Sequence, residues 1–430
     1  MYQVSDSQAV LRAHRSLLSR GRARTLVGRT VLLLGLTSLF TDISSELVST
    51  VLPLYLVYTL GLTPLQFGLI DGLYQGAGAL VRVASGFVGD RWHRHKEVAA
   101  TGYGLSAVCK LLFLAVGSFW PMIAATITLD RTGKGIRTSP RDAMISLSTP
   151  KEQLGTAFGV HRALDTTGAM IGPLLAFGML AAAPNAFHSI FLVSFCIALI
   201  GVGILVLFVD NPRVAPAAPA ASAEPAAPAQ KVSLRAAFAL VGARRFRTLL
   251  VVGAGLGLAT MSDGFVYLGL QRKLDFETRM LPLLYVGTAL VYMVLAVPFG
   301  KLADRVGRGK VFVAGYALLL LVYASLLGPS AGVVELVGVL LVFGGYYAAT
   351  DGVLMAAGSA VLPAELRGSG LALLTTGTSV SRLLASIVFG ALWTAFGLQL
   401  AVVAFACGLA VAAAASAVVL ARSRREPARA

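Results

Sequence analysis

The chain contains Gly86-Phe-Val-Gly-Asp90-Arg91-Trp-His-Arg94 and, later, Gly300-Lys-Leu-Ala-Asp304-Arg305-Val-Gly307-Arg308. The two stretches begin 214 positions apart, and each follows a long apolar run. A second pair recurs at nearly the same offset: Pro150-Lys-Glu152-Gln-Leu-Gly155 and Pro363-Ala-Glu365-Leu-Arg-Gly368. Self-similarity at a fixed offset indicates two copies of one structural unit.

Composition predicts a membrane protein. The 430 residues are 57% hydrophobic and 13% charged, whereas an ordinary soluble domain is about 25% charged. Apolar runs of roughly 20 residues recur along the chain, and each is long enough to cross a bilayer as a helix. We therefore expect an all-α membrane protein with twelve transmembrane helices. The expected spans are 29–59, 64–88, 97–119, 121–146, 155–182, 187–209, 248–270, 281–300, 309–328, 332–358, 368–394 and 397–421.

The repeat divides these spans into two six-helix bundles, 29–210 and 248–421. The segment 211–247 between them contains a Pro/Ala-rich stretch that cannot pack a core, so we expect a linker. The Arg-rich residues 1–28 have no apolar core of a signal peptide and are expected to form a cytoplasmic arm. Residues 422–430 are the expected tail. Parallel halves in an apolar chain are typical of a secondary transporter with its site between them.

The net charge of +16 would suggest nucleic-acid binding in a soluble protein. Here the basic residues collect in alternate loops, which predicts both termini and the linker in the cytoplasm and no nucleic-acid partner. We expect a monomer in the inner membrane, with the bilayer, protons and a small molecule or ion as partners. Cys109, Cys196 and Cys407 occur singly, without metal-ligand spacing. No phosphate-binding loop is present, so transport is expected to use an ion gradient or run downhill, without a cofactor.

Ionisable residues inside apolar spans are costly, and they indicate function. Asp42 and Glu46 are four apart on one helical face, as are Asp71 and Gln75, while His161 and Asp165 are four apart in the fifth span. The candidate coupling and cavity residues are Asp42, Glu46, Asp71, Arg82, Lys110, Arg131, His161, Asp165, Asp263, Asp351 and Arg382. We expect the first three to line the cavity, with Arg82, Lys110 and Arg131 as their charge partners.

Two interpretations of these residues stay open. Pairs such as Asp130 with Lys134, or Arg162 with Asp165, can be neutralised ion pairs that only hold helices together. Asp42, Glu46 and Asp71 have no base close by on their own helices. A carboxyl that is removed from water can bind and release protons near neutral pH, which is the chemistry of a proton-coupled carrier. His161 next to Asp165 could act as a relay or as a packing group.

The two repeated loops resemble the cytoplasmic signature of the major facilitator superfamily. The second copy matches fully, and the first has His93 where the family usually has Gly. The resemblance implies two six-helix bundles related by a pseudo-twofold axis and alternating access, rather than an enzyme. It assigns Gly86, Asp90, Arg91, Gly300, Asp304 and Arg305 to a cytoplasmic gate. There the glycines would allow close helix approach, and the acids would meet an Arg or a helix N-terminus.

Two further motifs resemble those of proton antiporters in this family. Arg131-Thr-Gly133-Lys-Gly135 is similar to the Arg motif that is associated with proton coupling. Gly168-Ala-Met-Ile-Gly172-Pro173 is similar to the antiporter motif, in which small residues permit tight packing and Pro173 fixes a bend. These matches favour export in exchange for protons.

Three longer stretches resemble a bacterial subgroup that includes nickel-resistance exporters. They are Thr41-Asp42-Ile-Ser-Ser-Glu46, residues 130–143, and His161-Arg162-Ala163-Leu-Asp165. The expected function is proton-coupled export of a small molecule. A metal-cation exporter and a lipid or metabolite transporter are the alternatives.

Overall fold

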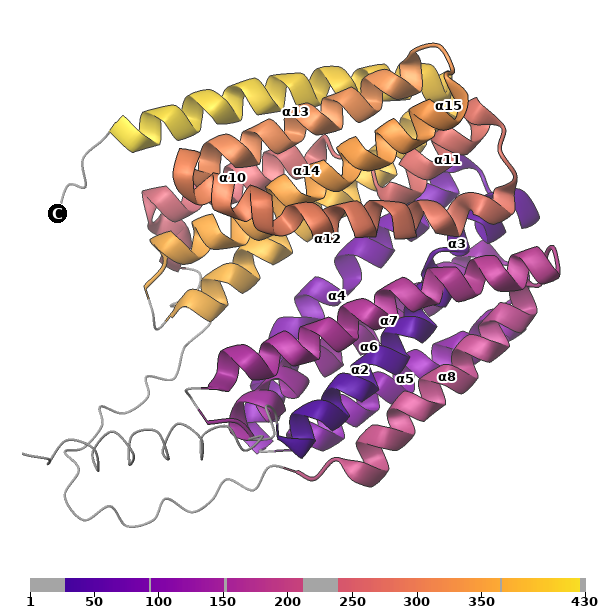
Figure 1. Ribbon diagram of the computed structural model, residues 1–430, viewed down its shortest axis with the longest axis vertical. Helices are drawn as coiled ribbons and strands as arrows, with labels where there is room; N and C mark the ends of the chain where they lie inside the picture. Colours follow the sequence, from indigo (N-terminus) through magenta and orange to yellow (C-terminus); the bar gives the residue numbers. More distant parts are fainter. Residues whose placement is uncertain (1–27, 93, 151–152, 212–238, 364–365, 426–430) are drawn as a thin grey trace, which may run out of the picture.

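The computed structural model describes residues 28–92, 94–150, 153–211, 239–363 and 366–425 (Figure 1). Within these ranges the chain is helical and contains no strand, which confirms the expected all-α class. The expected arm lies almost wholly outside the described residues, and the linker and the tail lie largely outside them. Each of the twelve expected spans lies largely in helix.

The N-half runs through α2 (Arg29–Ser49), α3 (Leu52–Leu54), the π-turn η1 (Tyr55–Thr59), α4 (Pro64–Trp92), α5 (His95–Ala115), α6 (Trp120–Leu147), α7 (Leu154–Ala182) and α8 (Phe187–Phe208). The C-half runs through η3 (Leu240–Gly242), α10 (Arg244–Leu258), α11 (Asp263–Leu274), η4 (Thr278–Met280), α12 (Leu281–Val306), α13 (Arg308–Leu327), α14 (Gly332–Val361) and α15 (Arg367–Arg425). Gly397 has a φ of 83° and divides α15 into two rods.

The two halves form separate helix bundles (Figure 1). In the N-half α2 packs on α7 and α8, and α6 packs on α4 and α5, while in the C-half α14 packs on α12 and α13. The halves touch each other mainly where α4 meets α15, and to a smaller extent where α7 meets α12. We call the end with the α4–α5 and α12–α13 connections the motif end. The halves lie together at the opposite end and diverge at the motif end (Figure 1).

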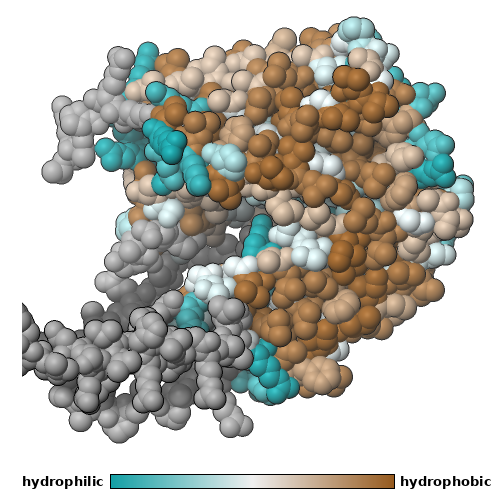
Figure 2. All heavy atoms as spheres, viewed as in Figure 1, coloured by the Kyte–Doolittle hydropathy of each residue, from teal (hydrophilic) through white to brown (hydrophobic). Residues whose placement is uncertain are grey.

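The outer surface is suited to lipid. Nine helical stretches in the described part of the chain are long and apolar enough to cross a membrane. Large apolar side chains point outward along them, such as Val294, Val333 and Leu207, with exposed fractions of 71%, 75% and 74%. Apolar residues cover much of the face shown in Figure 2. A helix satisfies its own backbone hydrogen bonds and can therefore stand in hydrocarbon. The protein is a multi-pass membrane protein.

The first span of the C-half is broken in its middle. Helix α10 ends at Leu258 and α11 begins at Asp263, so the regular helical hydrogen-bond pattern is interrupted between them. Tyr323 of α13 compensates, because its hydroxyl accepts from the Met261 amide at 2.7 Å and donates to the Ala259 carbonyl at 3.1 Å. Broken membrane helices are characteristic of transporter binding sites. This break places Asp263 in the first turn of α11, inside the protein.

Candidate functional site

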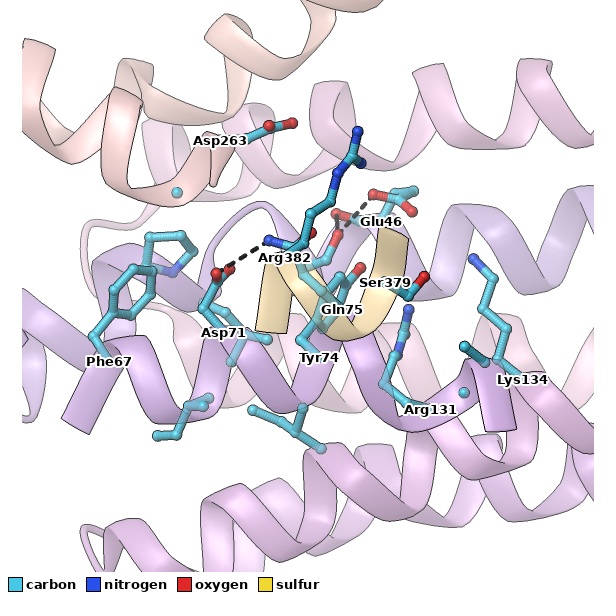
Figure 3. Close-up of a pocket in the computed structure, with 18 of the residues that line it drawn as sticks. Glu46, Phe67, Asp71, Tyr74, Gln75, Arg131, Lys134, Asp263, Ser379 and Arg382 are labelled. Atoms are coloured by element: carbon cyan, nitrogen blue, oxygen red, sulfur yellow. Dashed lines mark hydrogen bonds between the residues drawn. The ribbon is translucent and has the colours of Figure 1, made fainter. Parts of the chain in front are cut away.

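A cavity of about 390 Å³ lies between the two halves. Six charged residues line it: Glu46 from α2, Asp71 from α4, Arg131 and Lys134 from α6, Asp263 from α11 and Arg382 from α15. Its aromatic wall is formed by Phe67, Tyr74, Tyr285 and Tyr347. Both halves therefore contribute charges of both signs to one space (Figure 3).

The three acids of the cavity are held by uncharged hydrogen-bond donors. Glu46 accepts from the Ser49 hydroxyl at 2.7 Å. Asp71 accepts from the Gln75 amide at 3.2 Å and from Ser386 of the other half, and Asp263 accepts from Tyr347. None of the three forms an ion pair with any other described residue. Hydroxyl and amide partners can hydrogen-bond a carboxyl group in its charged or its protonated form.

The three cations of the cavity differ in their compensation. Arg131 donates to Asp130 at 3.0 Å and lies over the Tyr74 ring at 4.1 Å. Arg382 is 3.8 Å from Asp351. Lys134 forms no ion pair within the described ranges. In Figure 3 the Arg131 and Lys134 side chains extend in the same direction from their helix.

A buried cluster of three charges adjoins the cavity and shares Arg131 with its wall. Asp130, at 4% exposure, binds Lys110 of α5 at 2.8 Å and Arg131 at 2.5 Å. From the sequence, Lys110 and Arg131 were expected to compensate the negative charges of the cavity acids. The structure instead gives both an ion pair with Asp130, because the packing of α5 on α6 brings Lys110 to that carboxylate.

Several expected residues lie outside the central cavity. Asp42 of α2 faces Asp165 of α7, with Lys134 and Arg137 among the charges nearby. The Asp165 carboxylate is 3.5 Å from the Arg162 guanidinium and 3.9 Å from that of Arg141. The contact with Arg162 is the ion pair that the sequence suggested. The side chain of Arg82 is outside the described part of the chain.

His161 is buried, and its hydrogen bond fits the packing interpretation rather than the relay with Asp165. Its Nε2 lies 3.0 Å from the Ser38 hydroxyl of α2, so the imidazole joins α7 to α2 and its hydrogen-bonding partner is not Asp165.

A second cavity of about 440 Å³ adjoins the first on the side of the C-half. It contains Asp351 and, from the N-half, Arg162. The two cavities share Thr375, Ser379 and Arg382 as wall residues. Arg382 therefore stands at the boundary between them.

The cavity is closed at the opposite end by contacts between the halves. The Phe67 ring of α4 packs edge-on against Phe265 of α11 at 4.8 Å, and Phe265 packs on Phe389 of α15 at 4.7 Å. The Leu65 amide donates to the Thr394 hydroxyl at 2.9 Å. We call these five residues the seal. Tyr58 and Gln271, also from different halves, hydrogen-bond beside it.

Small residues permit this closure. A Cβ at Gly68 would lie 2.5 Å from the Ser386 carbonyl oxygen, and a Cβ at Gly390 would lie 2.4 Å from that of Pro64. Backbone atoms at these distances cannot move aside, so α4 and α15 approach this closely only with glycine at both positions. Neither the seal nor these glycines could be identified from the sequence. The spacing of residues shows which face of a helix they share, but it does not show which other helix that face meets.

Gly300 was expected in a loop with close helix approach, but it lies inside α12, and Asp304 lies in the last turn of the same helix. A Cβ at Gly300 would meet nothing within 4 Å, because the halves are apart at this end. Asp304 accepts from Arg308 at 3.0 Å, and Arg308 also donates to the Ala356 carbonyl of α14 at 2.8 Å. Through these contacts Arg308 connects α12 and α13 to α14. Arg305 is exposed. The surroundings of Gly86 and the side chains of Asp90 and Arg91 lie outside the part of the chain that the structure describes.

The glycines of the fifth span bring α7 against the helix that carries Asp42 and Glu46. A Cβ at Gly168 would lie 2.4 Å from the Leu39 carbonyl oxygen, and one at Gly172 would lie 2.8 Å from the Ile43 carbonyl oxygen. Pro173, inside α7, is buried. The motif therefore determines how closely the acid-bearing helix is held.

Gly172→Val is expected to destabilise the protein by at least about 2 kcal/mol, because the added atoms would overlap backbone on α2. Thermal unfolding of the purified protein in detergent measures this. Gly178→Val is the matched control on the same helix, since a Cβ at Gly178 meets nothing within 4 Å. Equal stability of the two variants would contradict the packing role of Gly172.

The fold and the cavity define a class of protein: a membrane carrier with two helix bundles that enclose a polar site. The model of the Major Facilitator Superfamily matches residues 34–288 and 264–430. An uncharacterized MFS-type transporter of Methanocaldococcus jannaschii is 30% identical over 376 residues, which are 85% of this chain and 89% of the relative. The chain belongs to the major facilitator superfamily.

Solved structures show the same fold. A crystal structure of the nucleoside transporter NupG has a TM-score of 0.73 at 18% identity and covers 91% of this chain and 100% of its own. An inward-facing, unoccupied bacterial homologue of the human lysosomal transporter Spinster has a TM-score of 0.71 at 16% identity, with 94% and 100% coverage. As a member of the superfamily, the protein is a secondary transporter that works by alternating access.

Proposed function

We propose that this protein exports a small charged organic molecule across the inner membrane in exchange for protons. The central cavity carries the proposal. It holds three acids that lack ion pairs with described residues, together with three cations, among membrane-spanning helices. Such charges are rare in membrane spans unless they serve transport.

The exchange would use the acids in two ways. When the cavity faces the cell interior, a positive group of the substrate would bind Glu46, Asp71 or Asp263 and displace a proton. The cations Arg131, Lys134 and Arg382 would hold negative groups of the same cargo. When the cavity faces outward, protons would replace the substrate. The Asp71 carboxylate accepts a hydrogen bond from Ser386 of the other half. We therefore expect protonation of Asp71 to change the stability of the closed contacts at the opposite end.

We place the motif end in the cytoplasm because basic residues dominate there. Lys301, Arg305 and Lys310 lie near the α12–α13 connection, and the acidic residue in this stretch of sequence is Asp304. At the opposite end Arg272, Lys273 and Arg279 are accompanied by Asp275 and Glu277. The positive-inside tendency favours the motif end as cytoplasmic. With this orientation the conformation described here is inward-facing.

A metal cation is the alternative cargo that the sequence resemblance suggests. Transition metals are bound by His, Cys or carboxylate clusters. Across the described ranges no group of three or more His, Cys, Asp and Glu is placed to hold a metal ion. We therefore favour an organic cargo with both aromatic and charged contacts.

The test is a proteoliposome assay with an imposed pH gradient and a pH-sensitive dye inside the vesicles. Organic cations, anions and zwitterions form one panel, and nickel and cobalt salts form the other. We expect one organic solute to trigger proton movement. Proton movement triggered only by metal ions would favour metal export over export of an organic molecule. Movement of a solute without protons would contradict the proposed proton coupling.

Locking the seal is expected to stop transport. Cysteines at Leu65 and Thr394, where the Leu65 backbone amide and the Thr394 hydroxyl are 2.9 Å apart, should be joined by a short, reducible bifunctional thiol reagent, which would hold the opposite end closed. Transport should fall to background and return after reduction. The native Cys109, Cys196 and Cys407 are first replaced by alanine, and each single-cysteine variant serves as a control. Full transport by the cross-linked protein would contradict alternating access through the seal.

A further inference from the structure

A groove of about 450 Å³ lies on the C-half, away from the central cavity. It runs between the motif-end segments of α10, α13, α14 and α15. Leu249, Ala357, Ala360, Val361 and Leu420 form its apolar wall, and Arg245 and Arg308 are its charged lining residues. An apolar slot with two guanidinium groups suits a ligand that has an anionic head and a hydrocarbon tail.

The two arginines are in different states. Arg308 is held in place by Asp304 at 3.0 Å and by the Ala356 carbonyl at 2.8 Å. Arg245, in the first turn of α10, is exposed and has no ion pair with any carboxylate in the described part of the chain. The groove therefore has one oriented guanidinium and one that lacks a carboxylate partner. An anionic oxygen group placed between them would be complementary to this charge.

The groove lies at the ends of membrane-spanning helices, where we expect lipid headgroups. Its arginines are at the ends of membrane-spanning helices, and the surfaces beside it are apolar. Val251, Val361 and Val418 have exposed fractions of 64%, 37% and 50%. Basic pockets between membrane helices can bind the headgroups of anionic lipids, and juxtamembrane basic residues are attracted to them. Hydrophilic residues gather near this end of the C-half in Figure 2.

We propose that this groove binds an anionic phospholipid, whose phosphate lies between Arg245 and Arg308 and whose acyl chain follows the apolar wall. A lipid here would bridge the start of α10 to Arg308, the first residue of α13, which is paired with Asp304 near the end of α12. Bound lipid would thereby stabilise the packing of the C-half at the motif end. The site is separate from the central cavity and does not depend on which molecule is transported.

The test measures binding of fluorescent phosphatidylglycerol to the full-length protein in detergent. Arg245→Ala is expected to weaken binding about tenfold, because it removes a charge-assisted hydrogen bond. Arg245→Lys should retain part of the affinity. Arg247→Ala is the matched control, since Arg247 is exposed on the same turn but does not line the groove.

Each arm has an outcome that would overturn the proposal. Equal weakening by Arg247→Ala would indicate general charge attraction. Equally tight binding of phosphatidylcholine would remove the selectivity for an anionic headgroup. Full displacement of the lipid by millimolar inorganic phosphate would assign the site to a free anion. Unchanged binding by Arg245→Ala, with its helical circular dichroism intact, would show that the groove is not the site.

Discussion

Asp130→Asn is expected to leave little folded protein in the membrane. Asp130 carries the one carboxylate that contacts both Lys110 and Arg131, at 2.8 Å and 2.5 Å. All three residues are at most 6% exposed. Removing one partner of a buried ion pair costs about 3–5 kcal/mol, because the remaining charge stays buried without compensation. Here two cations would remain, so the loss is expected at the upper end of that range.

The measurement is the yield of monodisperse protein after detergent extraction, together with its thermal unfolding. Asp142→Asn is the control on the same helix. It also removes an Arg–Asp pair, at 2.9 Å, but the Asp142 side chain is 44% exposed, and exposed pairs contribute about 0–1 kcal/mol.

A second variant separates charge from shape. Lys110→Met combined with Asp130→Asn removes a cation together with the carboxylate and should recover part of the lost stability. Wild-type stability of Asp130→Asn alone would show that the cluster is not what stabilises α5 against α6.

Asp42→Asn is expected to abolish proton-driven transport and leave the protein folded. Asp42 lies on α2, four positions from Glu46 in the cavity wall, and faces Asp165 of α7. A carboxyl group that is removed from water can bind and release a proton, which is the chemistry that proton coupling requires. Asparagine has nearly the same shape but cannot release a proton, so coupling would be lost while packing is preserved.

The experiment is solute efflux from proteoliposomes with and without a pH gradient. The variant is expected to lose the gradient-driven component, while its thermal unfolding stays near that of the wild type. Asp210→Asn, at an exposed position beyond α8, is the control and should transport normally. Normal gradient-driven efflux by Asp42→Asn would remove Asp42 from the mechanism. Failure of both variants would point to the preparation rather than to the residue.

Contacts between neighbours in sequence were predicted in part: Asp130 pairs with Lys110 and Arg131 rather than with Lys134, and His161 hydrogen-bonds to Ser38 rather than to Asp165. Asp71 and Gln75 share a helical face and are hydrogen-bonded, and Arg162 and Asp165 form the expected contact at 3.5 Å. The expected central cavity includes Glu46, Asp71, Arg131, Asp263 and Arg382. Such pairs follow from helical spacing, because residues three and four apart lie on the same face.

Contacts between distant helices were not predictable in this way. Lys110 was expected to serve the cavity acids and instead binds Asp130. Ser386, which donates to Asp71, was not singled out, although it lies four positions from Arg382 on the same helix. The break before Asp263 was also missed, because its stability comes from Tyr323 on another helix.

The amino-acid order alone determined that this protein crosses the membrane repeatedly in two related halves. Apolar runs of this length have no stable alternative to a helix in hydrocarbon, and a repeat is visible without any structure. Only the tertiary structure decided which charges meet, where the halves close and which acids remain without ion pairs in the described ranges. These features depend on how the helices rotate and cross, and residues far apart in the chain set those angles.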